Sequence, residues 1–440
     1  MPMVELSNRM SDALVDPRVI TWMNQVTSPM LGPVSQVTAV RYDMSSPGVY
    51  TFIPTISHIE RRLGTSMIAQ YHVGGYGLTP TDALTKAIGE AIERMGHVSS
   101  IPVIRHHIGS SDGPYVAPQQ FQQFSDDQWA SAGFPYQQVD VGQISWVDAL
   151  DTRTFDLVYV PRQLALVGSR PEDEPPINLA VTTGTAAHTS YKVAFFKAVL
   201  ELIEIDTVMG YWYGNTQPHR VTVNFETTPR LSQMLRRYRS SLNRQDTHFE
   251  FYWLPQIDNL PIFVALCAIV TDDVPWLSCG VGSAWDLESA MLSALLESIP
   301  VAGLAFSTFI RKIALKSPLP TDGNQIKDLD ENVLWYALSP DALSTFRKKF
   351  GEQITKVDSR DIDTPYVAVM PDSTISNILS TFKIYAIDLT TVESKSLGFW
   401  VQRLLSADLL RLCSPSYPER AHPRFVRYGG SMNEAPHPFA

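Results

Sequence analysis

The sequence predicts an α/β fold of the mixed α+β kind, with three related strand–glycine turn–helix units and mixed sheets. Short runs rich in β-branched and aromatic residues predict the strands. Three longer segments with apolar residues at helical spacing predict helices. Each of these helices follows a glycine-containing segment, and strands and helices alternate along the chain, which favours a layered architecture.

Seven runs have the composition of strands, at 34–42, 144–150, 156–161, 220–225, 248–254, 262–270 and 366–370. The stretches 110–120, 169–176 and 317–325 are dense in proline, glycine and polar residues, which is typical of loops. These loops are short, so they separate elements of one unit and do not look like linkers between domains.

The predicted helices, at 81–96, 191–210 and 287–300, resemble one another when they are aligned on Glu90, Glu201 and Glu297. Alanines stand seven and three residues before each glutamate, positions that share one helical face. They are Ala83 and Ala87, Ala194 and Ala198, and Ala290 and Ala294. The glycine-containing segments before the helices are 74–77, 182–187 and 279–284. A strand–glycine turn–helix unit therefore recurs three times.

The repeated glutamates are the candidate site. Glu90 and Glu93 are spaced i,i+3, as are Glu201 and Glu204, so each pair projects from one helical face. One interpretation is a solvated stripe in which Lys197 and Glu201 form an ordinary i,i+4 pair. The other brings these four and Glu297 together, where they repel one another unless cations neutralise them. Mg²⁺ favours carboxylates together with substrate phosphates.

Composition disfavours several other classes. The formal net charge is −10 and no run is rich in lysine and arginine, so binding to nucleic acid or to an anionic membrane is not expected. Cys267, Cys279 and Cys413 are too few and too far apart for a zinc framework. The start of the chain lacks a signal-peptide pattern, and the longest apolar run, 262–270, is too short for a membrane span. P-loop and GxSxG motifs are absent. We expect a cytoplasmic protein.

The three units resemble the three signatures of the YcaO family. GGYGLTPTDALTKAIGEAIERMG is similar to GGKGLT followed by SALGEAxER, and TTGTAAHTSYKVAFFKAVLELIEID is similar to SNGLAAG followed by ELIERDA. GVGSAWDLESAMLSALLES resembles a GxG segment leading to ALTEAxQ. The resemblance runs in order from about residue 28 to the end. It implies an N-terminal extension, 1–27, and a YcaO-type catalytic domain, 28–440.

The resemblance implies an ATP- and Mg²⁺-dependent enzyme that acts on peptide backbones. Azoline-forming members activate a backbone amide oxygen by phosphorylation after a Cys, Ser or Thr side chain of the substrate peptide has attacked the carbonyl. Loss of phosphate then leaves a thiazoline or oxazoline ring. Matched by motif position, the metal ligands are Glu90, Glu93, Glu201 and Glu204. The nucleotide-binding residues are these four with Arg94 and Glu297.

The C-terminus supports the azoline-forming branch. PHPFA (436–440) has the spacing of the PxPxP ending of those members, with Ala440 in place of the last proline. In the family such a tail places the terminal carboxylate in the active site as a general base, a role that falls to Ala440 here. A frayed, exposed terminus is the alternative.

The chain also departs from the family pattern. Tyr76 stands at the lysine of GGKG, and Lys86 at the first serine of SALGEAxER. Thr183, Ile205 and Pro300 replace an asparagine, an arginine and a glutamine of the signatures. Two alternatives therefore stay open. One is a YcaO-type synthetase that makes thioamides or amidines, and the other is a non-catalytic scaffold subunit of a peptide-modifying complex.

The resemblance also implies partners. The substrate is a ribosomal precursor peptide, and a separate E1-like or leader-binding protein recognises its leader. A flavin dehydrogenase that oxidises azolines to azoles can belong to the same assembly. We also expect the protein to form an oligomer.

Overall fold

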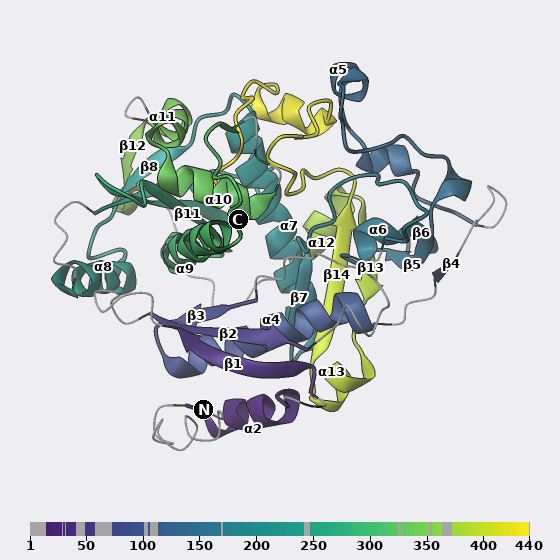
Figure 1. Ribbon diagram of the computed structural model, residues 1–440, viewed down its shortest axis with the longest axis horizontal. Coiled ribbons are helices and arrows are strands. Elements are labelled where there is room, and N and C mark those ends of the chain that lie inside the picture. Colours follow the sequence, from purple (N-terminus) through teal and green to yellow (C-terminus); the bar gives the residue numbers. More distant parts are fainter. Residues whose placement is uncertain are drawn as a thin grey trace.

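The computed structural model describes residues 15–28, 30, 32–40, 49–57, 73–100, 104–105, 113–168, 170–241, 247–323, 326, 328–351, 354–362 and 372–439. Its strands form three separate sheets. The long helix α7 (Tyr191–Tyr213) runs through the middle of the molecule, and the long helix α9 (Leu287–Ala314) lies to its left in Figure 1. The fold is therefore mixed α+β, as the sequence predicts.

The first sheet has three antiparallel strands in the order β1 (Val34–Val40), β2 (Tyr50–Ile56), β3 (Gly75–Gly77). Helix α4 (Pro80–Ser99) follows β3 directly and packs on β2 and β3. The N-terminal helix α2 (Pro17–Val26) packs in turn on α4. Residues 17–26 therefore share a core with α4.

The second sheet runs in the order β4 (Ile104–Arg105), β5 (Trp146–Asp151), β13 (Ile384–Asp388), β14 (Trp400–Ser406), β7 (Thr185–His188), with β6 (Leu157–Pro161) paired to β5. Helix α7 follows β7 and packs on β14 and β7. The smaller helices of this part are α5 (Asp126–Ala130), α6 (Arg162–Ala165), α12 (Asp372–Thr381) and α13 (Val392–Ser396).

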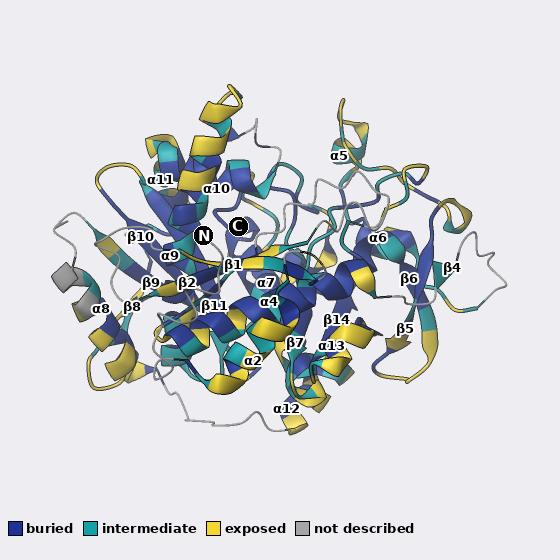
Figure 2. Ribbon diagram, turned by 60° about the horizontal axis from the view of Figure 1, so that its bottom comes forward, coloured by how far each residue is buried: buried dark blue, intermediate teal, exposed yellow. Residues whose placement is uncertain are grey.

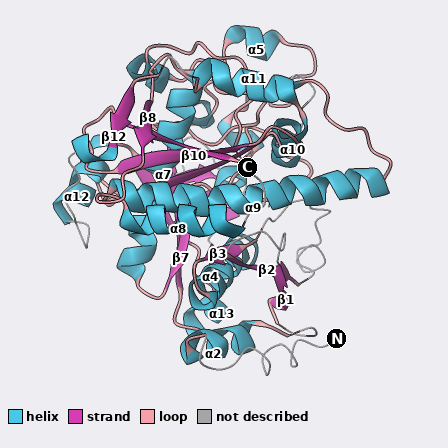
Figure 3. Cartoon of the chain, turned by 90° about the vertical axis from the view of Figure 1, so that its left-hand side faces the viewer, coloured by secondary structure: helices cyan, strands magenta, loops and turns pink. Residues whose placement is uncertain are grey.

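The third sheet runs in the order β11 (Leu277–Ala284), β10 (Phe263–Val270), β9 (His248–Leu254), β8 (His219–Thr222), β12 (Lys356–Asp358). It is mixed, because β12 pairs with β8 in parallel and the other pairs are antiparallel. Helix α9 covers β10 and β11, and α10 (Leu329–Leu338) packs on α9 (Figure 3). The remaining helices here are α8 (Pro229–Ser241) and α11 (Pro340–Lys349).

The predicted strand runs correspond to β1, β5, β6, β8, β9 and β10, while 366–370 lies outside the described residues. Strand β14 was missed because it buries Gln402 and Arg403, and two polar residues interrupt its apolar pattern. Strand β11 was missed as well, since its glycine-containing segment was expected to be a turn.

The predicted end of the third helix, at residue 300, was wrong. Helix α9 passes through Pro300 and continues to Ala314. Proline costs one backbone hydrogen bond inside a helix. Here the helix continues because Val301 and Ala305 beyond the proline bury against Val333 and Ala337 of α10. Among the described residues, α9 is also the one helix long and apolar enough to cross a membrane by length and composition alone. Its packing on β10 and β11 is that of a core helix.

Glycines in the strands and alanines in the helices fix how the first and third units close. A Cβ on Gly75 of β3 would lie 2.1 Å from both the Ala83 carbonyl oxygen and the Ala87 nitrogen of α4. A Cβ on Gly282 of β11 would lie 2.6 Å from the Ala290 oxygen. These atoms are backbone and cannot move aside, so the repeated alanines are the points at which helix backbone touches strand glycine.

The three units close into a ring. Each unit strand lies at the edge of its own sheet: β3 in the first, β7 in the second and β11 in the third. Each helix contacts its own strand and also the strand of the next unit, because α4 contacts β7, α7 contacts β11, and α9 contacts β3. Most residues of α4 and α7 are buried, and their ribbons are largely dark blue in Figure 2. The three glutamate-bearing helices therefore surround one common space.

Replacing Gly282 with alanine should destabilise the protein by about 1–3 kcal/mol, because the new methyl group is forced against helix backbone. Gly89→Ala on α4 is the matched control, since a Cβ at Gly89 meets nothing within 4 Å. That variant should gain about 0.4–1 kcal/mol through helix propensity. Thermal or urea unfolding measures both. Equal stability of the two variants would contradict the close-packing account.

Candidate functional site

The five predicted glutamates lie on the helices that form the ring. Glu90 and Glu93 come from α4, Glu201 and Glu204 from α7, and Glu297 from α9. Glu93 is buried and the other four are partly buried. Their mutual electrostatic effects link all three helices, because Glu201 raises the pKa of Glu93 and that of Glu297. The structure thus brings the predicted set together.

On α4, Arg94 neutralises both glutamates of its own helix. Its guanidinium forms an ion pair with Glu90 and lies 3.1 Å from the Glu93 carboxylate. Burial nevertheless raises the pKa of Glu93 well above its usual value, and the neighbouring charge of Glu90 adds to this rise. The arginine of the first signature therefore makes direct contact with both predicted acidic residues.

On α7, Ile205 occupies the position equivalent to Arg94, so the helix offers no cation there. Burial first, and then the charge of Glu204, raise the pKa of Glu201 to about 8. Burial also raises the pKa of Glu204 to about 7, although hydrogen bonds from Ser283 lower it in part. In the described part of the chain Glu201 has neither a hydrogen bond nor an ion pair.

Glu297 extends the cluster from the third unit. It accepts a hydrogen bond of 3.2 Å from the backbone nitrogen of Val281 in β11. Burial first, and then the charges of Glu204 and Glu201, raise the pKa of Glu297 to about 8. The carboxylate is thus held by its own strand and lies within electrostatic reach of the acidic pair of α7.

The structure argues against the solvated-stripe interpretation of α7. No ion pair joins Lys197 to Glu201 among the described residues, and desolvation is the main influence on the pKa of both glutamates of this helix. Carboxylates on a solvated face would not be desolvated in this way.

The donor set fits Mg²⁺ bound together with phosphate. Carboxylate oxygens are the protein ligands that Mg²⁺ accepts, and it usually takes only one or two of them alongside phosphates and water. Within the described ranges, no three His, Cys, Asp or Glu side chains lie close enough to hold a metal ion by themselves. The assignment of Glu90, Glu93, Glu201 and Glu204 as metal ligands therefore stays a prediction that relies on phosphate oxygens to complete the coordination.

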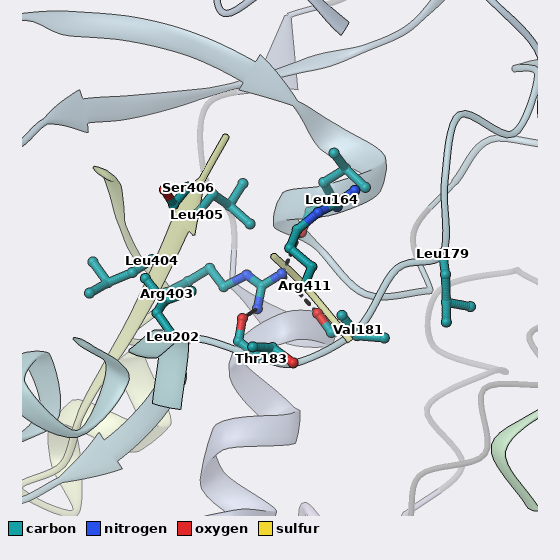
Figure 4. Close-up of a pocket in the computed structure, with 10 residues that line it drawn as sticks. All are labelled: Leu164, Leu179, Val181, Thr183, Leu202, Arg403, Leu404, Leu405, Ser406 and Arg411. Atoms are coloured by element: carbon teal, nitrogen blue, oxygen red, sulfur yellow. Dashed lines mark hydrogen bonds between the residues drawn. The ribbon is translucent and has the colours of Figure 1, made fainter. Parts of the chain in front are cut away.

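A buried arginine that the sequence reasoning missed lies behind the cluster. Arg403 of β14 donates hydrogen bonds to the carbonyl oxygens of Leu164 (2.7 Å), Val181 (2.8 Å) and Thr183 (Figure 4). It also donates to the Thr185 hydroxyl (3.0 Å). It borders an internal cavity of about 10 Å³. The charges of Glu201 and Glu93 partly offset the lowering of its pKa by burial.

Arg403 therefore fixes the segment of the second signature that precedes α7. A lone charged residue in the strand sequence WVQRLLS was the signal that could have revealed it. The departure at Thr183 does not loosen this segment, because Arg403 binds the Thr183 carbonyl oxygen and not the Thr183 side chain.

The residues before the chain end are buried and held. The Tyr336 hydroxyl donates to the Pro436 carbonyl (2.6 Å), and the Trp212 indole donates to the Ala435 carbonyl (2.9 Å). The Asn332 amide donates to the carbonyl oxygens of His437 and Phe439. The alternative of a frayed terminus is therefore wrong for 435–439. Ala440 itself lies outside the described residues.

Asp206 comes directly after Ile205 on α7. It holds the C-terminal region against this helix. It is fully buried and accepts hydrogen bonds from Arg424 (2.7 Å), Tyr428 (2.9 Å) and the backbone nitrogen of Leu410 (2.9 Å). A buried carboxylate with this many partners is structural. Asp206, the aspartate of the second signature, thus ties the C-terminal region to α7, the helix that also carries Glu201 and Glu204.

Comparison with known structures supports the fold. The chain is similar to YcaO from Methanopyrus kandleri bound with AMPPCP and Mg²⁺, at 18% identity and a TM-score of 0.58, over 95% of this chain and 93% of that one. It is also similar to the E. coli microcin synthetase McbBCD complex, at 13% identity and a TM-score of 0.61, over 93% of this chain and 98% of that one.

A third similar structure is a heterocyclase in complex with substrate and cofactor, at 18% identity and a TM-score of 0.70. The match covers 96% of this chain but only 57% of that one, so the chain spans little more than half of the heterocyclase. No curated protein matches this chain in sequence.

The family model described as YcaO cyclodehydratase, ATP- and Mg²⁺-binding, matches residues 74–409. This range contains all three units and every predicted glutamate, and the model's description confirms ATP and Mg²⁺ as the cofactors of the family. Because the match covers most of the chain, the protein belongs to the YcaO cyclodehydratase family.

Proposed function

We propose that the protein is the ATP- and Mg²⁺-dependent cyclodehydratase subunit of a peptide-modifying complex. It converts Cys, Ser or Thr residues of a ribosomal precursor peptide to thiazolines or oxazolines by phosphorylating the backbone amide oxygen. The observation that carries this proposal is the gathering of Glu90, Glu93, Glu201, Glu204 and Glu297 in one ring of helices.

Some side chains of this protein bind the nucleotide and its metal, and another group of the chain transfers a proton. When bound, ATP supplies the phosphoryl group and Mg²⁺ neutralises phosphate charge. Glu90, Glu93, Glu201 and Glu204 hold the metal, and Glu297 with Arg94 orients the nucleotide. The raised pKa values of Glu201 and Glu297 support a site that gains cations on binding, since burial and the neighbouring carboxylates destabilise both groups as anions.

The buried tail supports a role for the C-terminal carboxylate. Tyr336 and Asn332 of α10 hold Pro436, His437 and Phe439, and Trp212 of α7 holds Ala435, so the residues that lead to the chain end are fixed. We assign the carboxylate of Ala440 as the general base that takes the proton of the attacking side chain. A carboxylate that a rigid tail already positions loses little conformational entropy when the reaction takes place.

A non-catalytic scaffold is the second candidate, and Ile205 favours it because it leaves the α7 glutamates without an arginine on their own helix. A thioamide or amidine synthetase is a variant of the same enzyme with another nucleophile. In each case a separate partner binds the leader of the peptide. We also propose a cytoplasmic location and an assembly that can include a flavin dehydrogenase.

Glu201→Gln should abolish the modification, because it removes a metal-binding charge while keeping the shape of the side chain. The measurement is the mass of the peptide after incubation with ATP, Mg²⁺ and the leader-binding partner. Dehydration to an azoline removes about 18 Da per event, and a thioamide adds about 16 Da. Exposed Glu393→Gln on α13 is the control and should modify the peptide normally.

The outcomes separate the candidates. Full activity of Glu201→Gln would overturn the metal assignment. If the wild-type complex forms rings while this chain hydrolyses no ATP, the scaffold interpretation replaces the enzyme.

Adding one glycine after Ala440 should lower kcat strongly with little change in melting temperature. The addition moves the carboxylate by about 3.8 Å, which exceeds the tolerance of a proton-transfer geometry. The contacts of Pro436 to Phe439 remain in place, so stability should be preserved. An unchanged kcat would remove the general-base role from the C-terminus.

A further inference from the structure

Three buried side chains form a hydrogen-bonded network that joins the first unit to the second. They are His97 of α4, Thr185 of β7 and Arg403 of β14. The Thr185 hydroxyl accepts a hydrogen bond of 3.0 Å from Arg403, and a second one of 3.0 Å joins it to Nε2 of His97. None of the three residues is more than 2% exposed. Thr185 is therefore the junction between α4, β7 and β14.

The junction at Thr185 is particular to this sequence. The second signature, SNGLAAG, has leucine at the position that Thr185 occupies in TTGTAAH. A leucine side chain has no group that could accept from Arg403 or form a hydrogen bond with His97. The polar contact between the two units thus depends on a residue in which this chain departs from the signature.

The segment 183–185 supports α7 beside one of its glutamates. Gly184 has a positive φ of 85°, a conformation that glycine adopts without strain. A Cβ at Gly184 would lie 2.8 Å from Cδ2 of Leu202, the residue directly after Glu201 on α7. Leu202 and Arg403 also border the same internal cavity of about 10 Å³ (Figure 4). A shift of this segment would therefore move α7 at Glu201.

The other end of the network holds α4 beside Glu93. His97 follows Glu93 by four residues, so the two side chains share one face of the helix. The backbone N–H of Val167 donates to Nδ1 of His97 at 3.4 Å, so both ring nitrogens are engaged. A Cβ at Gly96 would lie 2.9 Å from Cγ1 of Val401 in β14. Helix α4 thus meets the second sheet one turn after Glu93.

Arg403 holds this segment with hydrogen bonds alone. Its partners are three carbonyl oxygens and the Thr185 hydroxyl, and within the described ranges it forms no ion pair. A buried cation without an ion pair is costly for the protein. What the guanidinium provides in return is a fixed placement of the segment between β7 and the loop before it.

We propose that His97, Thr185 and Arg403 are positioning residues, which set the spacing between the acidic pair of α4 and the acidic pair of α7. They act through the segment 183–185 and the end of α4, and they do not touch the nucleotide, the metal or the peptide. This inference rests on the proposed function, because the spacing matters only if both pairs serve one site.

Thr185→Val removes the hydroxyl and keeps the size of the side chain. The measurement is the Kd of AMPPCP at saturating Mg²⁺, obtained by calorimetry without any turnover. The Kd should rise about tenfold or more, because residues that orient metal ligands typically contribute about 10–100-fold to metal affinity. Thr185→Ser keeps the hydroxyl and should bind nearly as tightly as the wild type.

Thr152→Val is the matched control. The Thr152 hydroxyl is also buried and donates to the Ile384 carbonyl oxygen at 3.0 Å, at a point of the same sheet that two strands separate from β7. Both valine variants lose a buried hydrogen bond and should melt below the wild type. Only Thr185→Val should weaken binding of the Mg²⁺ complex of AMPPCP.

His97→Leu tests the same hydrogen bond from α4 and replaces Thr185→Val if that variant does not fold. It should also raise Kd. In the double variant the two losses should not multiply, because both changes remove the contact between His97 and Thr185.

The results distinguish two failures. If the wild type does not bind the Mg²⁺ complex of AMPPCP, the proposed function falls and the positioning role falls with it. If the wild type binds, and Thr185→Val and His97→Leu bind equally well, only the positioning role is overturned. It is also overturned if Thr152→Val weakens binding as much as Thr185→Val, since the loss then follows stability and not the network.

Discussion

Close contact between strand glycines and helix alanines is the constraint on which the rest of the structure depends. At Gly75, Gly280 and Gly282 the helix backbone lies so near the strand that no Cβ fits. This contact sets the height and rotation of α4 and α9 on their strands. Each glutamate follows its second alanine by three residues, so fixing the alanine also fixes where the carboxylate points.

The ring arrangement turns three local motifs into one site. Because α4, α7 and α9 each contact the strand of the next unit, their acidic faces converge. The same burial that gathers the carboxylates raises the pKa of Glu201 and Glu297 to about 8. Such a cluster is unfavourable alone and becomes favourable with bound cations, which couples the fold to its ligands.

The distribution of cations differs between the units. On α4 the signature arginine, Arg94, neutralises its own glutamates, whereas on α7 the equivalent residue is Ile205. Arg403 binds the loop before α7 from behind, and Asp206 ties the tail to the same helix. Helix α7 is thus the element to which the glutamates, the loop and the C-terminal region are all fixed.

By itself, the sequence determined the three units, the acidic positions Glu90, Glu93, Glu201, Glu204 and Glu297, and the family, because helical spacing and short motifs are local. Tertiary structure alone decided that α9 passes Pro300, that Lys197 leaves Glu201 unpaired, and that Arg403 lies behind the site. Each of these depends on contacts between segments far apart in the chain, such as α9 with α10 or β14 with the loop before β7. The local sequence pattern cannot predict them, because it does not show which distant segment a residue will contact.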